Sequence, residues 1–149
     1  MDAQTLISEG WTLQENTLID GSFDSNIGSY WTRTVNGSAS IGIILEKRHT
    51  NGHLGTAHGG LLSTFADIGL GLGVSSVMKE LSKYMVTISL SMKFLSIAKI
   101  GDFITITPEV TRESKQLVFV RGLIQTNGKT VASTEGIWKL LDSAKTQRK

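Results

Sequence analysis

One segment of the chain, residues 58–81, constrains the fold more than any other. It reads HGGLLSTFADIGLGLGVSSVMKEL, which is too long and too continuously apolar for a β-strand. Its apolar residues leave almost no polar face, and a helix that is apolar all round belongs in the interior of a fold. Each of its glycines lowers helix propensity by about 1 kcal/mol relative to alanine, so packing must offset that cost. The segment therefore predicts a long buried helix that a neighbouring backbone or a ligand approaches closely.

The rest of the chain has the patterns of β-strands. Residues 86–94, VTISLSMKF, alternate apolar and polar side chains, so Val86 is expected on an apolar face and Thr87 on a polar face. Further strands are predicted at 30–35, 39–46, 103–110, 117–125 and 130–141. Pro108 lacks an N–H group and is expected at a sheet edge or a bulge. The Asn-Gly pairs at 36–37 and 127–128 predict two-residue hairpin turns, whose central residues both need positive φ.

Together these elements predict a single α+β domain over residues 1–149, in which a curved antiparallel sheet wraps one long central helix. A short helix is expected at about 2–10, and a basic tail at 142–149. Because one sheet around one helix leaves its outer face open, we expect oligomerisation through a sheet edge or through the helix ends.

Composition excludes several classes of protein. The tail holds three of the 15 basic residues and one of the 13 acidic residues, so the rest of the chain has no net charge. This argues against nucleic-acid binding. No stretch approaches the roughly 18 apolar residues of a membrane-spanning helix, and the N-terminal residues lack the pattern of a signal peptide. The chain has no cysteine, which excludes disulfides and thiolate chemistry and fits a reducing compartment. We therefore expect a cytoplasmic protein.

Asp67 is the only charged residue between positions 58 and 78. Because burying an unpaired carboxylate is costly, its side chain must be hydrogen-bonded, protonated or turned toward a cavity. One interpretation is structural, with Asp67 bonded to the backbone of a neighbouring strand. The other is catalytic: Gly59 and Gly60 begin the helix two turns earlier, and backbone amides at a helix start stabilise an oxyanion. A carboxylate and an oxyanion hole suffice to hydrolyse an activated ester through a bound water.

The three histidines, at 49, 53 and 58, lie close together in the sequence. Their spacing resembles that of metal ligands only loosely, and no cysteine or carboxylate lies among them, so we expect no metal and no cofactor. His58 directly precedes the helix and either caps it or donates a hydrogen bond to a substrate carbonyl. Ser63 is not expected to be a nucleophile, because nothing around it matches a nucleophile elbow.

The stretch HTNGHLGTAHGGLLSTFADIGLGLG, followed by VTISLSMKFLSIAKIGD, resembles the hotdog-fold thioesterases of the phenylacetic-acid-pathway type. The run of His-Gly-Gly and the aspartate eight residues after its first glycine carry the resemblance most specifically. It implies a hotdog fold and an assembly of dimers, or of dimers of dimers (a homotetramer). It also implies active sites that lie across the dimer interface.

The resemblance also implies roles for individual residues. Asp67 matches the catalytic carboxylate, which either activates water or attacks the thioester. Gly59 matches the backbone amide that polarises the thioester carbonyl, and Thr87 matches a hydroxyl residue that positions the water. Asn51 matches a side chain that assists the oxyanion hole, with His53 as the alternative. His58 is the supporting histidine of the motif. The residues expected to contact substrate are His58, Gly60 and Asn51.

The resemblance therefore implies an acyl-CoA thioesterase that converts a fatty or aryl acyl-CoA into the free acid and CoA. One alternative is a non-catalytic module that binds acyl-CoA, with Asp67 purely structural. A hotdog hydratase or dehydratase fits less well, because the histidine motif of those enzymes has no match here. CoA carries phosphates, so basic side chains are expected at the mouth of the site. The candidates are Lys93, Lys99, Arg112, Lys115 and Arg121.

Overall fold

The computed structural model describes residues 1–15, 21–52, 54–78 and 83–142. Its helical elements are α1 (Ala3–Ser8), η1 (Phe23–Ile27), η2 (Lys47–His49) and α2 (Gly59–Val77). Its strands are β1 (Thr12–Gln14), β2 (Tyr30–Val35), β3 (Ser38–Ile44), β4 (Lys83–Phe94), β5 (Phe103–Ile106), β6 (Glu109–Glu113), β7 (Leu117–Thr126) and β8 (Lys129–Asp142).

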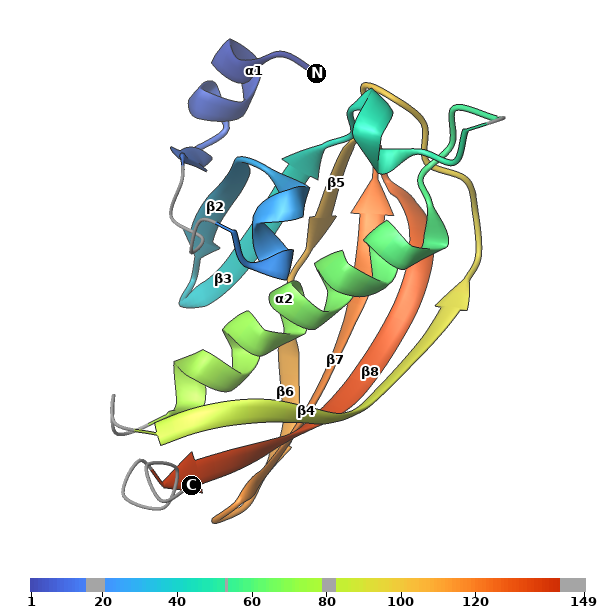
Figure 1. Cartoon of the computed structure of the whole chain (residues 1–149). Helices are drawn as coiled ribbons and strands as arrows, with labels where there is room; N and C mark the ends of the chain where they lie inside the picture. The colour runs from blue at the N-terminus through green and yellow to red at the C-terminus, as the bar shows by residue number, and fades with distance from the viewer. Residues whose placement is uncertain (16–20, 53, 79–82, 143–149) are drawn as a thin grey trace.

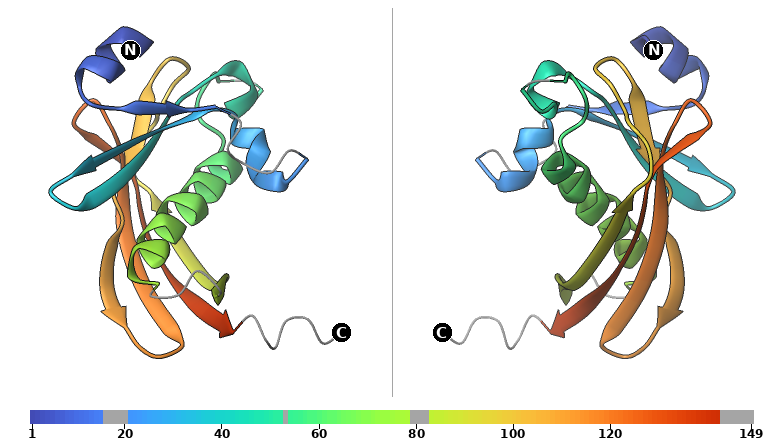
Figure 2. Two further views of the ribbon diagram at one scale, coloured as in Figure 1. Left: turned by 90° about the vertical axis from the view of Figure 1, so that its left-hand side faces the viewer. Right: turned by 90° about the vertical axis from the view of Figure 1, so that its right-hand side faces the viewer.

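The strands of the described residues form one antiparallel sheet that curls around α2 (Figure 1). The strand order is β1-β2-β3-β5-β7-β8-β4, and β6 pairs with β7 off this path. Two side views show α2 crossing the hollow of the sheet, while α1 lies at the N-terminal end of the molecule (Figure 2). This arrangement confirms the predicted hotdog fold of one long helix wrapped by a curved sheet.

The core of the protein lies between α2 and the concave face of the sheet. Phe65, Leu70 and Val74 of α2 are fully buried against apolar side chains of the central strands. By length and composition only, the 19-residue helix α2 is long and apolar enough to span a membrane. This corrects the expectation that no stretch of the chain approaches a membrane-spanning helix. A helix buried in the core of a protein can have the same length and apolar composition, and the packing of α2 against the sheet accounts for its composition.

Both predicted hairpin turns are confirmed. Asn36 and Gly37 have φ values of 51° and 80°, and Asn127 and Gly128 have values of 47° and 73°. The single strand predicted at 103–110 is instead two strands, β5 and β6, because Pro108 cannot donate a hydrogen bond to a neighbouring strand. The helix near the N-terminus is shorter than expected. Residues 79–82 and 143–149, where the long helix and the basic tail were predicted to end, lie outside the described residues.

A β-bulge in β4 changes which side chains point toward α2. Thr87 pairs with Trp138 and Ser89 pairs with Ile137, so Ile88 is the extra residue. Directly paired residues point to the same face of a sheet, and Trp138 belongs to the core. Thr87 therefore faces α2, and Val86 faces outward. The strict alternation predicted for 86–94 is wrong at these two positions, because one inserted residue reverses the faces on one side of it.

Candidate active site

Asp67 and Thr87 meet between α2 and β4. Thr87 Oγ1 donates a hydrogen bond to Asp67 Oδ1 at 2.7 Å. Asp67 is half-buried, and its Oδ2 accepts no hydrogen bond from the described residues. The structural interpretation of Asp67 predicted a backbone partner, but the partner is a side-chain hydroxyl that the Ile88 bulge turns inward. One oxygen of Asp67 is thereby oriented, and the other remains free to accept a proton.

A cavity of about 350 Å³ begins at this pair. Its volume lies within the range of small-molecule sites, and apolar side chains from several elements form much of its wall. Asp67 and Thr87 are joined in its lining by Asp24, Tyr30, Thr32, Ile41, Ile68, Gly71, Leu72, Ser75, Met85 and Trp138. Sequence reasoning missed Asp24, Tyr30 and Met85, since no local motif marks them and only the fold brings them to Asp67.

The start of α2 presents a free amide. His58 is the N-cap, and its Nδ1 accepts a hydrogen bond from the Gly60 amide at 2.9 Å. The His58 amide itself donates to the carbonyl of His49 at 2.9 Å. Among the described residues, the Gly59 amide has no partner, and it lies at the positive end of the helix dipole. Of the two roles left open for His58, the structure shows the capping one.

A loop held by side chains precedes this helix start. Asn51 Nδ2 donates to Thr56 Oγ1 at 2.8 Å, and its Oδ1 accepts from the Leu54 amide at 3.1 Å. The Asn51 side chain thus closes its own loop in this structure. His53, the alternative to Asn51, lies outside the described residues. No three His, Cys, Asp or Glu side chains of the described residues gather where they could hold a metal ion.

His49 is buried beneath this loop. Its Nδ1 accepts a hydrogen bond from the Glu46 amide at 3.0 Å, while its carbonyl receives the His58 amide. Burial lowers the pKa of His49 below its usual value, and the neighbouring Arg48 guanidinium lowers it further. A neutral His49 therefore links the loop to the start of α2. The spacing of the three histidines suggests only a loose match to metal ligands, and no sequence pattern indicates this structural role of His49.

The carboxylate and the free amide of one chain are too far apart to act on one substrate. Gly59 and Asp67 are eight residues apart on the same helix, which places them about 12 Å apart along its axis. An oxyanion donor must lie about 3 Å from the reacting oxygen, and the base must be within reach of the attacking water. One chain alone therefore does not bring both groups to the same carbonyl.

β4 forms one end of the sheet, and its outer edge is free of any partner strand among the described residues. Its large apolar side chains are exposed there, including Tyr84, Val86, Ile88 and Phe94. An open apolar edge strand next to Asp67 and Thr87 is a surface on which a further strand could pair.

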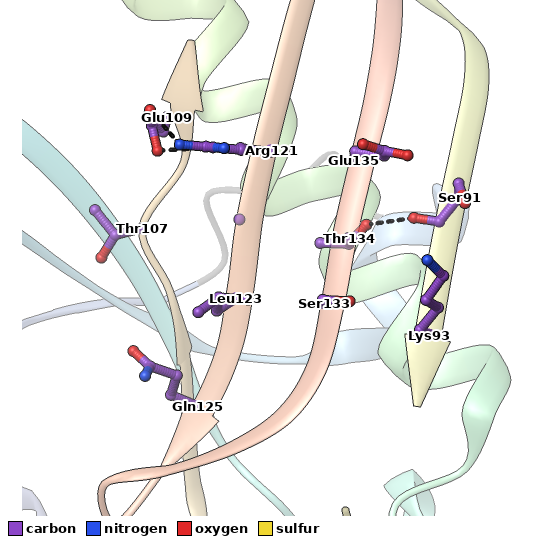
Figure 3. Close-up of a pocket in the computed structure, with 11 residues that line it drawn as sticks. Ser91, Lys93, Thr107, Glu109, Arg121, Leu123, Gln125, Ser133, Thr134 and Glu135 are labelled. Carbon is purple, nitrogen blue, oxygen red and sulfur yellow. Dashed lines mark hydrogen bonds and ion pairs between the residues drawn. The ribbon is translucent and has the colours of Figure 1, made fainter. Parts of the chain in front are cut away.

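A second concavity, of about 520 Å³, lies over strands β4, β6, β7 and β8 (Figure 3). Arg121 and Gln125 line it and alternate with the buried Val120 and Ile124, so it opens on the face directed away from α2. It contains none of the predicted catalytic residues. Arg121 is held there by Glu109, with two hydrogen bonds of 2.9 Å, so this candidate for phosphate binding is already paired.

Comparisons with known proteins show the family to which the chain belongs. Residues 54–133 match the family model of the thioesterase superfamily. A protein of Pseudomonas aeruginosa named as an esterase is 34% identical over 100 residues, which cover 67% of this chain and 73% of that protein. Mouse acyl-coenzyme A thioesterase 13 is 34% identical over 91 residues, 59% of this chain and 62% of that protein. The crystal structure of zebrafish thioesterase superfamily member 2 superposes with a TM-score of 0.73 at 25% identity, over 83% of this chain and 89% of that one. The chain belongs to the thioesterase superfamily and is a thioester hydrolase of the hotdog fold.

Proposed function

We propose that this thioesterase hydrolyses acyl-CoA, with Asp67 as the base that activates water. The Asp67–Thr87 pair carries the proposal, because it leaves a free carboxylate oxygen in the lining of a cavity with many apolar side chains. The similarity to a mouse protein named as an acyl-CoA thioesterase supports CoA as the carrier of the acyl group.

In the proposed reaction, the free oxygen of Asp67 accepts a proton from water as the water oxygen attacks the thioester carbonyl. The Gly59 amide donates to the carbonyl oxygen as negative charge develops on it. The carbon–sulfur bond then breaks, and the proton held by Asp67 passes to the departing thiolate. Thr87 fixes the orientation of Asp67 through the other carboxylate oxygen. Direct attack by Asp67 is the alternative, and it would place labelled oxygen in Asp67 after turnover in heavy-oxygen water.

We further propose that two copies pair along β4, so that Asp67 of one copy and Gly59 of the other act on one substrate. The eight-residue separation on α2 and the open edge of β4 support this arrangement. In a twofold dimer the same contact occurs twice, which gives two equivalent sites.

The first test replaces Asp67 with Asn, which keeps the shape of the side chain and removes the base. We expect kcat for acyl-CoA hydrolysis to fall roughly 10²–10⁴-fold, the usual contribution of a positioned acid or base. The matched control is Glu135→Gln, which removes an exposed carboxylate from the outer face of β8. An Asp67→Asn enzyme that retains full activity would refute the assignment. Tight acyl-CoA binding without hydrolysis by the unaltered protein would favour a binding module instead.

The second test asks whether the site is shared between copies. Gly59→Pro removes the amide hydrogen at the first helical position, where proline is well accommodated. Homodimers of Gly59→Pro and of Asp67→Asn should each be inactive. Mixing the two by unfolding and refolding should restore about a quarter of the original activity, because half of the dimers then contain one intact site. If mixing restores nothing while the chains demonstrably exchange, the site lies within one copy.

A further inference from the structure

Three glycines of α2 lie at alternate positions, Gly69, Gly71 and Gly73, and two of them have an evident packing reason. A Cβ atom at Gly69 would overlap the Ile106 side chain of β5. At Gly73 it would come within 2.8 Å of the rigid Pro108 ring. These two glycines let the sheet approach the helix closely, as a buried helix of this kind requires.

The packing around residue 71 does not require glycine. A Cβ atom there would meet only Met85 Cε, at 3.4 Å, which is ordinary van der Waals contact with the end of a flexible side chain. An alanine would fit at this position and would raise helix propensity by about 1 kcal/mol. The conformation of the helix therefore does not demand glycine at residue 71, and neither does its packing.

Gly71 instead forms part of the wall of the Asp67 cavity. It follows Asp67 by four residues and so lies on the same face of α2, about 6 Å further along the axis. Leu72 of α2 and Met85 of β4 line the cavity beside it, and both are apolar. Gly71 therefore presents bare backbone to the cavity, between side chains of α2 and β4.

We infer that Gly71 determines how long an acyl chain the site accepts. This inference rests on the proposed acyl-CoA hydrolysis at Asp67. The acyl chain extends from the reacting carbonyl along α2, over the bare backbone of Gly71 and between Leu72 and Met85. A larger side chain at position 71 shortens the cavity beyond the reacting carbonyl and leaves Asp67 and Thr87 in place. The site is thus built for acyl groups that reach at least one helical turn past the carboxylate.

The test compares acetyl-CoA with decanoyl-CoA as substrates of the unaltered protein and of Gly71→Ala and Gly71→Leu. For Gly71→Leu, the ratio of kcat/KM for decanoyl-CoA to that for acetyl-CoA should fall by roughly tenfold or more, the scale on which apolar pockets discriminate. Gly71→Ala should shift the ratio in the same direction while remaining fully folded. The matched control is Ser76→Leu, which adds the same side chain to an exposed position of α2 outside this cavity. Its ratio should not change.

The outcomes separate this inference from the function on which it rests. If the unaltered protein hydrolyses no acyl-CoA, the proposed function fails. If it hydrolyses both substrates and Gly71→Leu leaves their ratio unchanged, the role of Gly71 is refuted and the function stands. An equal shift in Ser76→Leu would also refute it, because the effect would then belong to the helix as a whole. A loss of acetyl-CoA hydrolysis equal to that of decanoyl-CoA would overturn the inference in the same way.

Discussion

The three helix glycines give a stability prediction whose sign differs from position to position. Overpacking a buried site costs about 1–3 kcal/mol, and alanine returns about 1 kcal/mol of helix propensity. At Gly69 the new methyl group meets Ile106, a branched side chain fixed in a central strand, so Gly69→Ala should lower the free energy of unfolding by about 1–2 kcal/mol. Gly73→Ala should cost about 1 kcal/mol, less than Gly69→Ala, because the new methyl group would approach Pro108 Cβ to 2.8 Å, a smaller overlap than the one at Gly69. Gly71→Ala should leave the free energy of unfolding unchanged or raise it by up to about 1 kcal/mol.

Urea unfolding followed by tryptophan fluorescence measures these differences, since Trp11, Trp31 and Trp138 are all buried. All variants should be compared at one protein concentration, because the stability of an oligomer depends on it. The expected order of the urea midpoints is Gly69→Ala lowest, then Gly73→Ala, then Gly71→Ala. Equal destabilisation at all three positions would refute the reasoning, since it would mean that Gly71 is as tightly packed as the other two. It would also remove the ground for assigning Gly71 to the cavity wall.

Three further predictions concern the site and the loop before it. Thr87→Ala should lower kcat less than Asp67→Asn does, because water partly replaces a hydroxyl group; equal losses in steady-state assays would assign Thr87 a larger role. His58→Ala should lower the free energy of unfolding by about 1 kcal/mol through loss of the N-cap, measured as a lower urea midpoint; an unchanged midpoint would contradict the capping role. Because burial lowers the pKa of His49, its neutral form stabilises the fold above pH 6.5, and this stability is lost as the pH falls toward the folded-state pKa. His49→Asn should flatten this acid dependence of the urea midpoint, and an equally steep dependence in the variant would exclude His49 as its source.

The features that the sequence predicts well are those fixed by local chemistry. The apolar run at 58–81 leaves almost no polar face, which predicts a central helix, and α2 occupies Gly59–Val77 of it. The Asn-Gly pairs at 36–37 and 127–128 are similarly decisive, because few residues tolerate positive φ at two successive positions. Asp67 was identified for the same kind of reason, as a lone carboxylate in an apolar segment.

The features that the sequence hides depend on contacts between distant segments. Pro108 predicts an edge or a bulge, but nothing in 103–110 shows that the strand divides there into β5 and β6, or that β6 pairs with β7. Asp24 and Tyr30 reach the Asp67 cavity only because η1 and β2 lie over α2, far from it in sequence. A local pattern predicts such neighbours only when the topology is already known.

The bulge at Ile88 explains why the alternating pattern of residues 86–94 predicts the wrong orientation for Thr87, the partner of Asp67. Residues 86–94 alternate so regularly that an unbroken strand is the simplest interpretation, and it turns Thr87 away from the helix. Because one residue is inserted at Ile88, Leu90 and Met92 after the bulge face the core, and Thr87 before it also faces α2. Thr87 can therefore donate its hydrogen bond to Asp67. Val86 and Ile88 are apolar although they are exposed, because they lie at the open edge of the sheet, where apolar side chains suit pairing with a second copy. For this reason apolar and polar residues alternate in the sequence without a visible break. The same stretch thus serves two needs, the orientation of the proposed base and the proposed interface that completes the site.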